Sequence, residues 1–217
     1  MDPRKKLVRD CYDSIAGIWA SANGRRALDY PDDGERERVW FERFAAALPP
    51  GARVLDLGCG NGEPLLADLQ ARGFRAVGID LSQQQLVRAH ARCPDALVLR
   101  GDMSEVAFAD ASFDGIVAYH SIFHVPRQEH AAIFAQARRW LADGGIALLT
   151  MAELSAEKFD DGPGLFTELE GAPTYYDAHR VDVPLALIAA AGFDVLDCYR
   201  PILKGTGGVL MALARAR

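Results

Sequence analysis

One stretch of the sequence, VLDLGCGNGEP at positions 54–64, combines residue types that could bind a small charged ligand. Gly58, Gly60 and Gly62 alternate directly after an apolar run, and glycine lets a ligand approach the backbone closely. A helix that starts after this turn offers unpaired N–H groups and a partial positive charge, which suit a carboxylate or a phosphate. Asp56, just before the turn, suits a cationic group better. The stretch therefore predicts a ligand site with two kinds of charge recognition.

Strands and helices alternate around this turn. The patterns predict helices at 4–19, 35–48, 62–72, 83–92 and 127–141, and strands at 52–57, 74–80, 96–100, 113–120 and 146–151. Such alternation indicates a parallel sheet covered on both faces, with ligands bound at the carboxyl ends of its strands. The glycine turn follows the first strand, so it lies at that edge.

The end of the chain departs from this alternation. After a helix at 181–191, strands at 193–200 and 208–216 follow without a helix between them, so we expect an antiparallel hairpin. The segment from Glu153 to Arg180 is long and irregular, as lids and binding elements are. Its aromatic residues suit a flat or apolar small molecule, although they could equally serve to bury the insert against the sheet.

The identity of the expected ligand follows from how the glycine turn differs from a dinucleotide-binding motif. The dinucleotide-binding fingerprint is GxGxxG, but here Glu63 stands at the third glycine. Its carboxylate would also repel a pyrophosphate. A ligand with an ammonium group, a carboxylate and a ribose suits both the turn and Asp56, and S-adenosylmethionine has all three.

Five motifs in order resemble those of the class I S-adenosylmethionine-dependent methyltransferases. They are VLDLGCGNG (54–62), VGIDLS (77–82), RGDM (100–103), FDGIVAYHSIFHV (113–125) and LADGGIALLT (141–150). The resemblance covers about half of the chain. It implies a Rossmann-like, doubly wound α/β fold with a seven-stranded sheet, mostly parallel, with an antiparallel C-terminal hairpin and helices on both faces.

The resemblance also assigns a cofactor site. It implies that Asp80 holds the ribose hydroxyls, that Asp102 and the Met103 N–H face the adenine, and that the turn at 58–62 holds the carboxylate of the cofactor. CYDSIAGIW (11–19) resembles a segment that folds over the methionine end of the cofactor, although this chain has Trp19 where the family usually has tyrosine. A plain amphipathic lid helix is the alternative. The expected cofactor-binding residues are Tyr12, Trp19, Asp56, Gly58, Cys59, Gly60, Asp80, Leu81, Asp102, Met103 and Tyr119.

Methyl transfer asks little of the protein beyond positioning, and a general base helps only when the acceptor must lose a proton. His120 and His124, at and just beyond the fourth strand, are the candidate catalytic bases, with structural histidines as the alternative. His179 in the insert is a third candidate. We expect no metal, because the motif HSIFH lacks a glutamate between its histidines and Val125-Pro126 interrupts a helix.

Composition limits the partners. The chain has 217 residues with a net charge of −6, and its basic residues form no long stripe, which disfavours nucleic acid. No signal peptide or membrane span is recognised, the four cysteines form no CxxC pair, and we expect a cytoplasmic protein, monomer or homodimer. The expected single domain, 1–217, divides into lid helices (1–48), a cofactor-binding core (52–151), a substrate lid insert (152–180), and a C-terminal helix and hairpin (181–217).

The acceptor is expected to be a small molecule. Ala118-Tyr119-His120-Ser121 replaces the Asp/Asn-Pro-Pro-aromatic motif of nucleic-acid amino methyltransferases, and the two glutamates of arginine methyltransferases are missing there. The prediction is transfer of a methyl group from S-adenosylmethionine to an O or N atom, with S-adenosylhomocysteine as product. The alternatives are a nicotinamide-dependent Rossmann oxidoreductase and a non-catalytic S-adenosylmethionine-binding protein.

Overall fold

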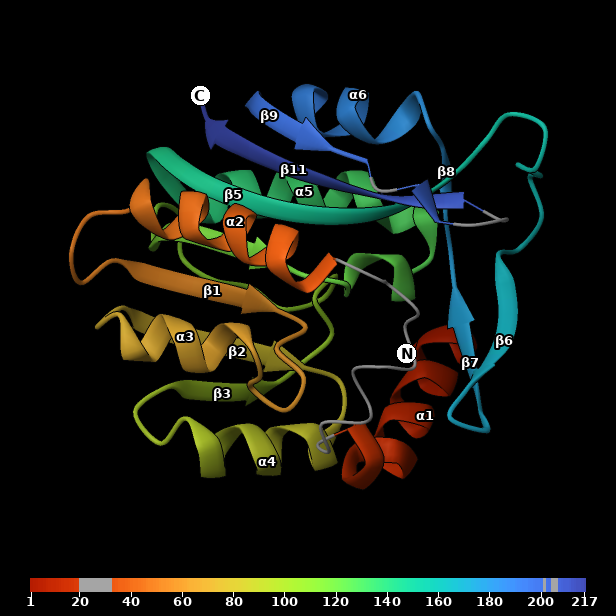
Figure 1. The fold of residues 1–217 in the computed structure, drawn as a ribbon, viewed down its shortest axis with the longest axis horizontal. Coiled ribbons are helices and arrows are strands. Elements are labelled where there is room, and N and C mark those ends of the chain that lie inside the picture. The colour runs from red at the N-terminus through yellow and green to blue at the C-terminus, as the bar shows by residue number, and fades with distance from the viewer. Residues whose placement is uncertain (20–32, 201, 204–206) are drawn as a thin grey trace.

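The computed structural model describes residues 1–19, 33–200, 202–203 and 207–217, without the side chains of Trp19 and of residues 33–37, 202–203 and 207. A mixed sheet forms its centre (Figure 1). In space the strands run β3-β2-β1-β4-β5-β11, with β9 and β10 beside β11 and β8 beside β5. The bounds are β1 (Arg53–Leu57), β2 (Arg75–Asp80), β3 (Leu97–Arg100), β4 (Phe113–Ala118), β5 (Leu141–Leu154), β8 (His179–Arg180), β9 (Phe193–Tyr199), β10 (Ile202–Leu203) and β11 (Gly207–Ala216).

This topology confirms the expected doubly wound α/β fold. β1 to β5 pair in parallel, whereas β11 runs antiparallel to both β5 and β9, as expected for the C-terminal hairpin. The short strands β8 and β10 are additions to the expected seven, and they bring the sheet of the described residues to nine strands.

Helices cover both faces of this sheet. The apolar sides of α2 (Asp33–Ala46), α3 (Leu65–Ala71) and α4 (Gln83–Arg92) share one buried cluster with Val54 and Leu148. α5 (Arg127–Trp140) and α6 (Val183–Ala190) share the other, around Leu55 and Trp140. Alternate residues of a strand point to opposite faces, so Val54 and Leu55 belong to different clusters. Among the described residues, no helix combines the length and apolar character needed to cross a bilayer.

Several helix and strand boundaries differ from those expected from the sequence, and those of α3, β4 and β5 bear on the site. α3 begins at Leu65 rather than at residue 62, because the turn continues through Gly62, Glu63 and Pro64. β4 ends at Ala118, two residues early, because His120 adopts a left-handed conformation that leaves the strand. β5 runs over Leu141–Leu154, longer than expected at both ends, because β4 pairs with it at Leu141 and β11 pairs with it as far as Glu153.

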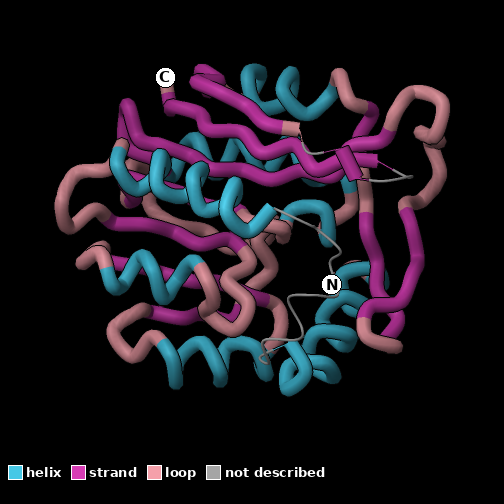
Figure 2. The backbone as a smooth tube through the Cα atoms, in the orientation of Figure 1, coloured by secondary structure: helices cyan, strands magenta, loops and turns pink. Residues whose placement is uncertain are grey.

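The insert is more regular than the sequence indicates. It contains an antiparallel pair, β6 (Leu165–Leu169) and β7 (Ala172–Tyr176), which forms a small sheet of its own. Figure 2 shows this hairpin beside the N-terminal helix α1 (Pro3–Trp19). Cys11, Ile15 and Leu169 form the buried contact between the two. The predicted lid insert and the first predicted lid helix therefore pack as one unit.

Candidate functional site

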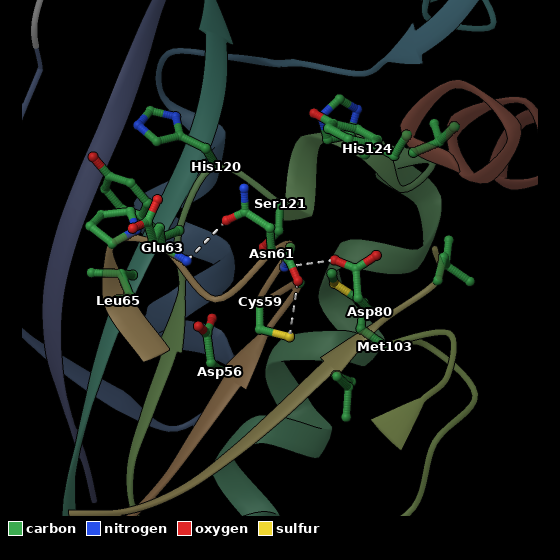
Figure 3. A pocket seen from close by; sticks show the side chains of 18 of the residues that line it. Asp56, Cys59, Asn61, Glu63, Leu65, Asp80, Met103, His120, Ser121 and His124 are labelled. Atoms are coloured by element: carbon green, nitrogen blue, oxygen red, sulfur yellow. Dashed lines mark hydrogen bonds between the residues drawn. The ribbon is translucent and has the colours of Figure 1, made fainter. Parts of the chain in front are cut away.

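A cavity of about 690 Å³ opens where β1, β2 and β4 end. Its wall includes every residue expected to hold the cofactor except Trp19, whose side chain lies outside the described residues, together with His120 and His124. Figure 3 shows Asp56 deep in this cavity, Asp80 on one side, and the two histidine rings apart from each other at its upper rim. The fold thus brings together residues from α1, the glycine turn and three strands.

The glycine turn lies against the end of β4. Gly58 has φ +84°, and a Cβ there would come within 2.4 Å of the Cβ of Ser121. The Ser121 hydroxyl donates a hydrogen bond to the Leu57 carbonyl, which fixes this close approach. Gly60 has φ +52°, but a Cβ there would meet no protein atom within 4 Å. Because Gly60 lines the cavity, the space beside its backbone is left to a ligand.

Asp56 is a buried carboxylate with 2% of its surface exposed. No described residue donates a hydrogen bond to it or pairs with it. Burial, together with the nearby negative charge of Asp80, raises the pKa of Asp56 to about 8. A carboxylate that is held in a cavity without a protein partner is a binding group for a cation.

Asp80, at the end of β2, holds the turn. One of its carboxylate oxygens accepts a hydrogen bond from the Gly60 N–H at 2.9 Å, and the other accepts one from the Ser82 N–H at 2.8 Å. Burial raises the pKa of Asp80 to about 6, and these hydrogen bonds oppose that rise. Asp80 therefore connects two backbone loops at the rim of the cavity, a position open to ribose hydroxyls.

Asp102 is held from several directions at once. One oxygen accepts hydrogen bonds from the N–H and the hydroxyl of Ser104, and the other lies 2.7 Å from the ammonium group of Lys5. Lys5 also reaches Glu129 at 2.7 Å, so it joins α1 to two core segments. Sequence reasoning missed Lys5, because its partners lie about 100 residues away along the chain.

A second contact fixes α1 over the cavity. A carboxylate oxygen of Asp13 accepts hydrogen bonds from the Ser82 hydroxyl at 2.5 Å and from the Gln84 N–H at 3.0 Å. Ser82 is the N-cap of α4, as expected, and accepts from the Gln85 N–H. Asp13 thus contributes to the helix start that lies next to the end of β2.

His124 and Tyr12 form a pair in the cavity wall. The Nδ1 of His124 lies 3.0 Å from the Tyr175 carbonyl, so Nδ1 carries the proton of the neutral ring. Its Nε2 lies 2.9 Å from the Tyr12 hydroxyl and accepts a hydrogen bond from it. Burial lowers the pKa of His124 to about 4. His124 is therefore neutral at pH 7, and it aligns Tyr12.

His120 occupies a different part of the wall. Its ring packs edge-on against Tyr119, with 4.3 Å between centroids, and lies 5.9 Å from Phe123. Its backbone has φ +52°, which non-glycine residues seldom adopt. Unlike the buried His124, it is partly exposed at the cavity.

His179 does not line the cavity. Its Nε2 lies 3.0 Å from Nδ1 of His130, whose own Nε2 donates to the Val125 carbonyl. This buried pair joins β8 to α5 away from the cavity. Among the described residues, no cluster of three His, Cys, Asp or Glu side chains is placed to hold a metal ion.

The comparison with known families agrees with this geometry. The profile of a methyltransferase domain matches residues 54–145, which carry the glycine turn, Asp80, Asp102 and both histidines of the wall. Residues 54–145 are a methyltransferase domain. The class I S-adenosylmethionine-dependent methyltransferase motifs recognised in the sequence are thereby confirmed, and this class takes its methyl group from S-adenosylmethionine.

Individual relatives extend the match. The chain is 38% identical over 112 residues to 27-O-demethylrifamycin SV methyltransferase of Amycolatopsis mediterranei, covering 48% of this chain and 40% of that protein. It is 36% identical over 157 residues to 24-methylenesterol C-methyltransferase 2 of Oryza sativa, covering 67% of this chain and 41% of that protein. The chain thus spans about two fifths of the length of these two relatives.

A solved structure shares the whole fold. The 1,6-didemethyltoxoflavin-N1-methyltransferase of Burkholderia thailandensis, determined with its acceptor and S-adenosylhomocysteine, superposes with a TM-score of 0.70 at 21% identity. The superposition covers 100% of this chain and 91% of the other. It therefore extends beyond the methyltransferase domain to α1 and the C-terminal strands.

The methyltransferase domain and α1 fit the cofactor of this class. Asp56 offers an unpaired carboxylate for the ammonium group, and Gly60 leaves open space at the turn. The N–H groups of residues 58, 59, 60 and 62 already donate within the protein, so the turn offers a ligand mainly this space. Several lining residues were not expected from the sequence: Val8, Arg38, Phe41, Asn61, Ser121 and Val125. Asn61, Ser121 and Val125 lie within the recognised motifs. Val8, Arg38 and Phe41 come from α1 and α2, where no motif indicates a binding role.

Proposed function

We propose that this chain transfers a methyl group from S-adenosylmethionine to an O or N atom of a small, flat and largely apolar acceptor. The observation that carries the cofactor half of the proposal is the buried, unpartnered carboxylate of Asp56 beside the open glycine turn. The methyltransferase domain at 54–145 supports the same reaction class. When bound, S-adenosylmethionine supplies an electrophilic methyl group on a positively charged sulfur.

The residues of the cavity divide this task. Asp56 pairs with the ammonium group, the glycine turn leaves space at Gly60 for the carboxylate, and Asp80 accepts from the ribose hydroxyls. Asp102 and the Met103 N–H, which also line the cavity, recognise the adenine in this proposal. Tyr12, aligned by His124, and α1 above it close the methionine end against water.

The acceptor class follows from the remaining wall. Tyr12, Phe41 and Tyr119 line the cavity beside the two histidines. Phe123 and Tyr176 pack behind them, 5.0 Å and 4.6 Å from the His124 ring. Aromatic walls favour flat or apolar ligands. By their names, the relatives act on a demethylrifamycin at oxygen and on a didemethyltoxoflavin at nitrogen, which supports a ring-containing acceptor.

The base that we propose is His120 rather than His124. Nε2 of His124 already accepts from Tyr12, and burial opposes its protonation. His120 is partly exposed at the cavity. In this role a ring nitrogen of His120 would accept the proton of the acceptor O–H or N–H group. The electron pair of that group would then bond to the methyl carbon as the carbon–sulfur bond breaks and its electron pair stays on sulfur. A histidine base favours O or N over carbon, although a sterol C-methyltransferase is among the relatives.

Calorimetric titration tests the cofactor half. Wild type should bind S-adenosylhomocysteine saturably, and Asp80→Ala should lose about 1–3 kcal/mol of binding free energy. NADH serves as the competing probe, because binding of NADH alone would identify a nicotinamide-dependent oxidoreductase. Transfer of a labelled methyl group is then measured with a catechol, a hydroxynaphthoquinone and a heteroaromatic N–H compound. Cofactor binding without transfer to any of a broad panel would favour the non-catalytic alternative.

A further inference from the structure

The turn after β4 places His120 in a backbone conformation that carries strain. Among the described residues, Ala111, His120 and Glu170 are the non-glycine residues with positive φ. Ala111 and Glu170 are exposed turn residues, whereas His120 lies at the cavity. Strained backbone at a binding site persists only when surrounding contacts hold it. The question is which contact holds His120.

The contact comes from the neighbouring strand. Thr150, a fully buried residue of β5, accepts a hydrogen bond from the His120 N–H at 2.5 Å through its hydroxyl. The same hydroxyl donates to the Ala118 carbonyl at 3.1 Å. The Thr150 hydroxyl thus forms hydrogen bonds both with Ala118, the last residue of β4, and with His120, where the chain leaves the strand.

The sheet explains why a side chain is needed there. The pairing of β4 with β5 ends at Ala118 and Leu149, and β8 pairs with the same strand only from Glu153 onward. Thr150 lies in the interval between these two partners. Because His120 has left the strand, its N–H cannot continue the backbone ladder, and a buried N–H needs another acceptor. The hydroxyl of Thr150 supplies it.

We propose that Thr150 is a positioning residue for methyl transfer: its hydroxyl holds the left-handed turn that presents the His120 ring to the acceptor. This inference rests on the proposed function of His120. Without the hydroxyl, the peptide after Ala118 is free to relax toward an extended conformation, which swings the ring along the wall. The cofactor contacts of Asp56, Gly60 and Asp80 do not involve Thr150 and stay in place.

Two matched substitutions separate the hydroxyl from the volume of the side chain. Thr150→Val keeps the shape and removes the hydroxyl, whereas Thr150→Ser keeps the hydroxyl and removes a methyl group. With an accepted substrate, we expect Thr150→Val to lower the turnover number about tenfold or more. Thr150→Ser should keep most of the wild-type turnover number, because it retains the hydroxyl. In a His120→Ala background, Thr150→Val should have no further effect, because the residue acts through His120. An equal loss in that background would overturn the proposal.

A spectroscopic test does not depend on finding an acceptor. In protein labelled with ¹³C-histidine and saturated with S-adenosylhomocysteine, the ring signal of His120 should shift or broaden in Thr150→Val and match wild type in Thr150→Ser. Signals of His124, His130 and His179 should stay unchanged. A His120 signal identical in wild type and Thr150→Val overturns the positioning role, even if methyl transfer is demonstrated. If Thr150→Val does not fold, Thr150→Ala replaces it. Conversely, a failure to bind S-adenosylhomocysteine in wild type would count against the proposed function alone, and the same spectra of the cofactor-free protein would still decide on Thr150.

Discussion

The ammonium group of Lys5 lies 2.7 Å from the carboxylate of Asp102, and each of these side chains exposes less than 5% of its surface. This ion pair joins the N-terminal helix to the loop that follows β3. Lys5 contacts Glu129 and the Ser104 hydroxyl as well, so a single side chain has three polar partners outside α1. The position of α1 over the cavity therefore depends on a buried charge, in addition to apolar packing.

Lys5→Met should destabilise the protein by about 3–5 kcal/mol, because it leaves a buried carboxylate without its partner. Lys6 is the matched control: its pair with Asp10 is exposed to solvent, so Lys6→Met should be near neutral. Urea denaturation measures both. If α1 is held by packing alone, the two variants will unfold at the same urea concentration.

Cofactor binding should depend on pH through Asp56. With a pKa of about 8 in the free site, this carboxyl is neutral at pH 7 and must lose its proton to pair with an ammonium group. Affinity for S-adenosylhomocysteine should therefore rise with pH up to about 8, by at most about tenfold per unit. Calorimetry at pH 7 in two buffers of different ionisation enthalpy should detect proton release in wild type. Asp56→Asn should abolish that release, and a release of equal size in this variant would assign the proton to another group.

The raised pKa of Asp56 should also make the free energy of unfolding depend on pH. The pKa of Asp56 is raised in the folded state above its unfolded value of 3.8, so the folded state retains this proton longer as the pH rises. The free energy of unfolding of the cofactor-free protein should therefore fall between about pH 4 and pH 8. Asp56→Asn should flatten this part of the stability curve, as measured by urea denaturation at several pH values.

Alanine at three glycines should separate folding from binding. Gly51, Gly58 and Gly60 all have positive φ, so each substitution costs about 1 kcal/mol of backbone strain. Gly58→Ala adds the clash with Ser121 and should lower stability further, whereas Gly51→Ala and Gly60→Ala should show the strain alone. Only Gly60→Ala should fold well and yet lose cofactor affinity, as measured by thermal melting and calorimetry. Normal affinity in this variant would place the ligand elsewhere.

Tyr12→Phe and His120→Ala should differ in kinetics. Removing the Tyr12 hydroxyl leaves Nε2 of His124 unsatisfied and should weaken S-adenosylhomocysteine binding, because Tyr12 covers the cavity. His120→Ala should instead lower the turnover number about a hundredfold with binding preserved. His124→Ala should resemble Tyr12→Phe. If His124→Ala shows the turnover defect and His120→Ala does not, the roles assigned to the two histidines are reversed.

Much of the core could be predicted from sequence because its determinants are local. Gly58 and Gly60 need left-handed backbone, Ser82 caps the helix after β2, and the apolar alternation of 52–57 marks a strand. The turn residues Gly62, Glu63 and Pro64 were wrongly included in a helix, because apolar periodicity marks a helix's packed face more clearly than its first turn.

The parts that could not be predicted depend on distant contacts. Nothing near Lys5 distinguishes it from Lys6, yet the first is buried and the second exposed, because Asp102 and Glu129 approach only in the fold. The hairpin of β6 and β7 was missed because its strands mix polar and apolar residues, and most of β6 is exposed. The sequence around Thr150 is that of an ordinary strand. The contact of its hydroxyl with the His120 N–H exists only because β4 stops pairing with β5 beside it, and this depends on the fold.

The hairpin of β6 and β7 rests on α1 through Leu169, Cys11 and Ile15, and its Tyr175 carbonyl holds the ring of His124. Two segments separated by about 160 residues in sequence thus support the same part of the wall, α1 directly through Tyr12 and the hairpin through His124. An attempt to transplant acceptor preference from another enzyme should therefore move α1 and the hairpin together. A graft of either element alone would break the packing of Cys11 and Ile15 on Leu169.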